Sequence, residues 1–129
     1  VMSFVRIDDR PIRIYSRIKE PDMVVILDAS VMDMVNVLQG LKQGGRIFIN
    51  SVEAKDFPGF STCHADLTGL AQKENIIVAG YTILNTPMLG CLAKMGIISL
   101  DSARKSILEM FPDECNVRAA EAGYREMKL

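Results

Sequence analysis

Four polar residues stand at positions where an α/β protein places ligand-binding groups. Asp28 and Asn50 each end an apolar segment, and Asn85 and Thr86 directly precede a proline that opens a helical pattern. Open α/β sheets bind their ligands beyond the carboxyl ends of parallel strands, so Asp28, Asn50, Asn85 and Thr86 are our candidates for a cofactor-binding or ligand-binding pocket. Helix capping and loop hydrogen bonding use the same side chains, and a structural role is the alternative for each.

Metal binding and covalent catalysis find little support in the sequence. His64 is the only histidine and has no second ligand at a metal-binding spacing, so we expect a structural role for it and no metal site. Cys63, Cys91 and Cys115 are odd in number and widely spaced, which predicts buried free thiols. The sequence contains no glycine-rich phosphate loop, nucleophile elbow or His-Glu-x-x-His motif. We therefore predict no catalytic residue on this chain.

The composition is that of an ordinary globular protein. The 129 residues, of which 49% are hydrophobic, suit one compact domain over residues 1–129. Fifteen basic and sixteen acidic residues give a net charge of −1, so the charge favours neither nucleic acid nor an anionic membrane as a partner. No apolar run approaches the ~20 residues that span a bilayer. We expect a cytoplasmic protein.

Two apolar segments separated by a helical pattern predict a parallel β-α-β unit. Residues 23–27 form an uninterrupted apolar run, as in a strand buried on both faces, and residues 46–50 form the next strand. Between them, Ser30 is placed to cap a helix over residues 31–41, where apolar positions recur at helical spacing. This unit would bring the first two polar candidates to the carboxyl ends of adjacent strands.

The rest of the chain predicts mainly helices. The expected elements are a short strand over residues 61–63, a helix over 66–73, an extended stretch over 76–84, and helices over 100–111 and 114–127. Ahead of the last two helices, Thr86 suits an N-cap and Pro87 the first helical position, and Gly96 would close a helix of about ten residues.

The first eighteen residues predict an antiparallel hairpin. Residues 3–7 and 12–18 alternate apolar and polar positions around the turn-rich Asp8-Asp9-Arg10-Pro11. The hairpin is rich in arginine, at positions 6, 10, 13 and 17. These side chains belong either to a solvated sheet face or to a subunit contact or anion site, because the planar guanidinium fits carboxylate and phosphate.

Taken together, these elements predict an α/β fold. We expect a Rossmann-like three-layer domain with a mostly parallel sheet, an antiparallel hairpin at one edge and C-terminal helices.

Several motifs, in this order, resemble one family. They are residues 1–13, residues 20–28, the Asn85-Thr86-Pro87-Met88-Leu89-Gly90 motif, Leu92-Ala93-Lys94, residues 96–100 and the helix around residues 116–124. Together they look like the gamma subunit of pyruvate and related 2-oxoacid:ferredoxin oxidoreductases, over essentially the whole chain. The Asp9–Arg13 segment looks closer to the pyruvate type.

The resemblance implies a supporting role in a larger enzyme. Such complexes oxidatively decarboxylate a 2-oxoacid on thiamine diphosphate, pass electrons through iron-sulfur clusters to ferredoxin, and release an acyl-coenzyme A. The cofactors lie on other subunits, so we expect none on this chain, and its role would be structural, near the side where coenzyme A enters. The implied partners are alpha, beta and delta-type subunits, ferredoxin through the complex, and a second copy in a homodimer when the subunit is isolated.

The family also begins with a glycine-rich Gly-x-Gly-Gly-Gln-Gly strand-turn-helix and a basic loop ahead of the hairpin. Neither is present in these 129 residues, so we expect an N-terminal portion to be missing. The alternative function is a stand-alone α/β ligand-binding or regulatory domain, whose pocket would lie at Asp28, Asn50 and the Asn85-Thr86 turn.

Overall fold

A three-stranded parallel sheet forms the centre of the protein in the computed structural model, which describes residues 1–129. Its strands lie in the order β1 (Met23–Ile26), β2 (Arg46–Asn50) and β3 (Ser61–Ala65). Beyond β3, the backbone of His64 pairs in antiparallel fashion with that of Lys128, so the C-terminal segment covers that edge of the sheet. The carboxyl ends of β1 and β2 are adjacent, as the sequence predicts.

Both faces of the sheet are covered, which gives three layers. Ile47 and Ile49 of β2 point to one face and Phe48 to the other, and all three are fully buried. The first face packs against the connection between β1 and β2 and the loop before β3, through Ala29, Met32, Val37, Leu38, Leu41, Phe57 and Phe60. The second packs against helices, through Leu67, Met88, Cys91 and Met127. The α/β class with a parallel sheet is thereby confirmed.

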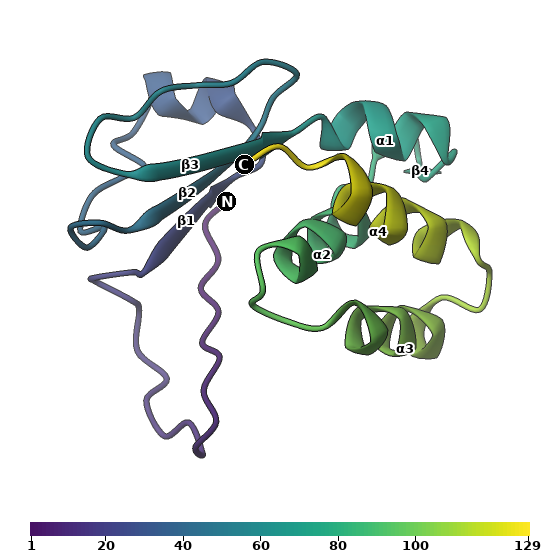
Figure 1. Ribbon diagram of the computed structural model, residues 1–129, viewed down its shortest axis with the longest axis horizontal. Coiled ribbons are helices and arrows are strands. Elements are labelled where there is room, and N and C mark those ends of the chain that lie inside the picture. The colour runs from purple at the N-terminus through teal and green to yellow at the C-terminus, as the bar shows by residue number, and fades with distance from the viewer.

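Four helices gather on one side of the sheet (Figure 1). They are α1 (Leu67–Lys73), α2 (Asn85–Lys94), α3 (Leu100–Met110) and α4 (Cys115–Glu126). α2 and α4 touch at Gly90 and Gly123, where each glycine lies directly against the backbone of the other helix. This close crossing anchors the helical layer. None of these helices has both the length and the hydrophobicity that a membrane-spanning segment needs.

The antiparallel hairpin lies elsewhere than predicted. Residues 3–7 and 12–18 form no strands, and no backbone hydrogen bond joins them. Residues 1–20, which we call the arm, instead run away from the sheet and back as an open loop (Figure 1). The hairpin in the structure is β4 (Ile77–Val78) with β5 (Tyr81–Thr82), within the predicted extended stretch.

The predicted helix over residues 31–41 is also wrong. Only a short 3-10 helix, η1 (Ala29–Asp33), forms there, and its N-cap is Asp28 rather than Ser30. Two features stop a longer helix. The Asn36 side chain accepts the Leu38 N–H in a local turn, and Gly40 adopts a φ of 81°. Leu38 and Leu41 still pack against the sheet, whereas Met34 and Val35, which share the predicted helical stripe, are 81% and 51% exposed.

The loop between β4 and β5 is strained at one position. Ala79 and Gly80 have φ values of 51° and 83°, the left-handed conformation that a two-residue hairpin turn requires. Alanine pays a steric cost there that glycine does not. We expect Ala79→Gly to raise the free energy of unfolding by about 0.5–1 kcal/mol, measured by urea denaturation. The same change at Ala103, a buried helical position, is the control and should destabilise the protein.

Candidate functional site

Asp28 and Asn50 lie where the sequence places them, but their side chains are engaged within the chain. The Asp28 carboxylate accepts hydrogen bonds from the Ser30 hydroxyl (2.7 Å) and the Ser30 N–H (3.0 Å), and these bonds lower the pKa of Asp28. Asn50 donates to the Leu27 carbonyl (3.0 Å) and the Thr68 hydroxyl (3.0 Å), and accepts from the Leu67 N–H (2.8 Å). Asn50 therefore ties the end of β1 to the start of α1.

Asn85 and Thr86 are the first two residues of α2, and their side chains differ in solvent exposure. Asn85 is exposed, whereas Thr86 is buried. The Thr86 hydroxyl donates to the Asn116 amide oxygen on α4 (3.1 Å). The prediction of Thr86 as the N-cap is wrong, because the helix begins two residues earlier than predicted, at Asn85, and its cap residue, Leu84, makes no side-chain hydrogen bond. No hydrogen bond joins this pair to Asp28 and Asn50. Ligand contact by the four candidates stays a prediction.

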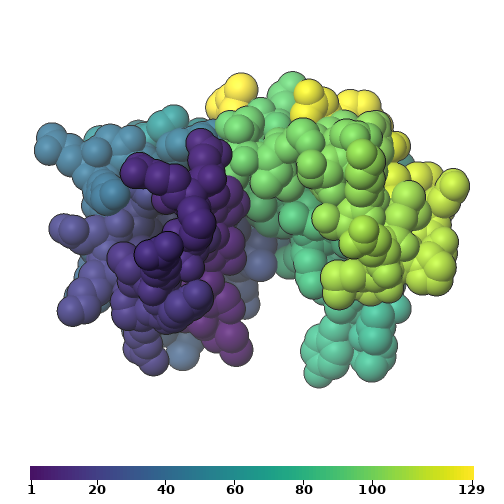
Figure 2. All heavy atoms as spheres, turned by 90° about the horizontal axis from the view of Figure 1, so that it is seen from below, coloured from purple at the N-terminus to yellow at the C-terminus, as the bar shows by residue number.

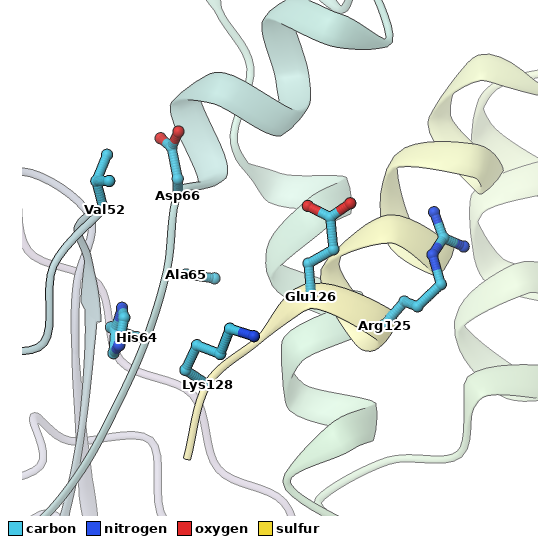
Figure 3. Close-up of a pocket in the computed structure, with 7 residues that line it drawn as sticks. All are labelled: Val52, His64, Ala65, Asp66, Arg125, Glu126 and Lys128. Atoms are coloured by element: carbon cyan, nitrogen blue, oxygen red, sulfur yellow. The ribbon is translucent and has the colours of Figure 1, made fainter.

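A polar pocket of about 350 Å³ lies beside the carboxyl end of β3 (Figure 3). Asp28 and Asn50 lie at the carboxyl ends of the other two strands of the sheet. β3 and the start of α1 supply one side of it, and the end of α4 with the segment after it supplies the other. Its lining residues are Val52, His64, Ala65, Asp66, Arg125, Glu126 and Lys128. None of the four predicted candidates lines it. Arg125 and Lys128, the basic residues that line the pocket, were not predicted from the sequence. They follow β3 by about sixty residues in the chain and are not part of a recognisable motif.

His64 is the only titratable ring in this pocket, and its contacts are with backbone. Its Nδ1 lies 3.2 Å from the Ser51 carbonyl oxygen, which favours the tautomer with the proton on Nδ1. In Figure 3, Asp66 and Glu126 rise on the same side, while Arg125 turns away from His64. Two acidic and two basic side chains balance one another, so the pocket suits a small polar or dipolar molecule better than a strong anion. No hydrogen bond links His64 to a carboxylate.

The three thiols are free, and all have a raised pKa. Burial raises the pKa of Cys63, and burial together with the nearby Cys63 raises the pKa of Cys91 to about 12. Cys115 is partly exposed and donates to the Asp113 carboxylate (2.7 Å), which raises the pKa of Cys115. Such thiols stay protonated at neutral pH, so they are poor nucleophiles and poor metal ligands. The prediction of buried free thiols is confirmed for Cys63 and Cys91.

Thiol labelling should reflect these environments. At about pH 8, we expect a thiol reagent to modify Cys115 in the folded protein and to reach Cys63 and Cys91 only on unfolding. Asp113→Asn removes the carboxylate that stabilises the protonated thiol, so the pKa of Cys115 falls and its labelling rate rises. Stopped-flow labelling with mass spectrometry measures the rate, with Glu109→Gln as the control. An unchanged rate in Asp113→Asn would contradict the hydrogen bond.

Comparison with known proteins gives one consistent result. Residues 1–126 match the family model described as pyruvate ferredoxin/flavodoxin oxidoreductase. The pyruvate synthase subunit PorC of Methanocaldococcus jannaschii is 42% identical over 131 residues, which are 98% of this chain and 71% of that protein. A common gamma subunit of pyruvate/ketoisovalerate oxidoreductases from Thermococcus kodakarensis is 39% identical over 138 residues, 98% of this chain and 72% of that one.

A solved structure has the same fold. The crystal structure of pyruvate oxidoreductase subunit PORC from Thermotoga maritima superposes with a TM-score of 0.71 at 34% sequence identity. The match covers 86% of this chain and 66% of that chain, so the present chain spans just under two thirds of the solved relative.

Proposed function

Because this chain belongs to the pyruvate ferredoxin/flavodoxin oxidoreductase family, we propose that it serves as the gamma subunit of a complex that oxidatively decarboxylates pyruvate or a related 2-oxoacid. The complex would form an acyl-coenzyme A and pass the electrons to ferredoxin. The similarity over residues 1–126 carries this proposal, together with two relatives whose names describe subunits of such enzymes. A cytoplasmic location is part of the proposal.

The exposed surface of the chain supports a role as a subunit. Large apolar side chains lie on it, including those of Val25, Val78 and Met110, at 40%, 62% and 75% exposure. Alpha, beta and delta-type subunits are the partners we propose.

The residues of this chain do not fit an iron-sulfur cluster. A cluster needs several thiolates, usually four, around one centre. The chain has only three cysteines, of which Cys63 and Cys91 are buried in the core and Cys115 is not. No group of three or more histidine, cysteine, aspartate or glutamate side chains is arranged to hold a metal ion. We therefore propose that the clusters and the thiamine diphosphate belong to other subunits and that this one has a supporting role.

Purification from native cells tests the proposal. The tagged full-length protein would be isolated under anaerobic conditions and its companions identified by mass spectrometry, with untagged cells as the control. We expect a thiamine-binding and an iron-sulfur subunit in near-equal amounts, and ferredoxin reduction when pyruvate and coenzyme A are added. Recovery of the protein alone, or with unrelated proteins, would instead favour the stand-alone ligand-binding domain.

A further inference from the structure

We draw no further inference here: the strongest candidate, the polar pocket between the carboxyl end of β3 and the end of α4, is an open hollow whose charged residues are all exposed, and nothing in the structure shows what fills or covers it.

Discussion

Replacing Gly90 with alanine is expected to lower the free energy of unfolding by more than about 3 kcal/mol. A Cβ atom at this position would lie 2.6 Å from the Ala120 carbonyl carbon and 2.8 Å from the Tyr124 nitrogen. Both are backbone atoms of α4, so no side chain can rotate away and the two helices must separate. Alanine is otherwise the better helix former by about 1 kcal/mol, so the measured loss is smaller than the steric cost by about that amount.

Urea denaturation followed by circular dichroism measures this change. Gly44→Ala is the control, because Gly44 has a φ of 74° and open space around its Cβ position. It should cost about 1–2 kcal/mol through backbone conformation only. Gly123→Ala, where the Cβ would lie 3.1 Å from the Pro87 carbonyl carbon, should resemble Gly90→Ala. Equal stability of Gly90→Ala and the wild type would mean that the two helices do not cross this closely.

Replacing Asn50 with alanine should cost about 2–4 kcal/mol. The change removes three hydrogen bonds at once and leaves the N–H of the fully buried Leu67 without its partner. An unpaired buried donor costs more than the bond itself contributes. Hydrogen exchange should localise the effect to the first turn of α1 and the end of β1.

The same substitution at Asn36 is a matched control. Its side chain accepts a single exposed hydrogen bond, at 3.3 Å from the Leu38 nitrogen, so Asn36→Ala should cost less than about 1 kcal/mol. The comparison also tests the predicted pocket. If Asn50→Ala leaves stability within about 1 kcal/mol of the wild type but slows the assembled enzyme, Asn50 contacts a ligand and its structural role is secondary.

The sequence predicts well those elements whose burial is local. The central strand at residues 46–50 is buried on both faces through Ile47, Phe48 and Ile49, and α3 and α4 have clear apolar stripes. The apolar run at residues 23–27 does form a strand, but it is not buried on both faces as expected, because Val25 and Leu27 are each 40% exposed. The pattern misled for residues 31–41 because apolar residues recur there at helical spacing although only part of them is buried: Leu38 and Leu41 pack on the sheet, and Met34 and Val35 are exposed. The prediction of a hairpin in the arm was wrong for another reason. Alternating apolar and polar residues show that a segment can form a strand, but they do not show that a second strand lies beside it to form the hydrogen bonds.

The site was only partly predictable for the same reason. Asp28 and Asn50 reach the expected edge of the sheet because strand order follows from the β-α-β pattern. Thr86 looked like a cap because Thr-Pro is a common helix start, and only the packing of α2 on α4 puts its hydroxyl against Asn116. The pocket beside His64 depends on Arg125 and Lys128 returning to the sheet, a long-range contact that no local pattern encodes.

The β4–β5 hairpin limits how this polypeptide can be handled. Residues 76–84 contain no charge and no proline, and Ile77, Val78 and Tyr81 are 46%, 62% and 76% exposed where the hairpin projects from the body (Figure 2). Short uncharged segments of this kind stack readily into intermolecular β-structure. Protein that is produced in excess of the partner that covers this hairpin is therefore expected to precipitate as its concentration rises. The concentration of soluble protein should increase when its binding partners are produced with it.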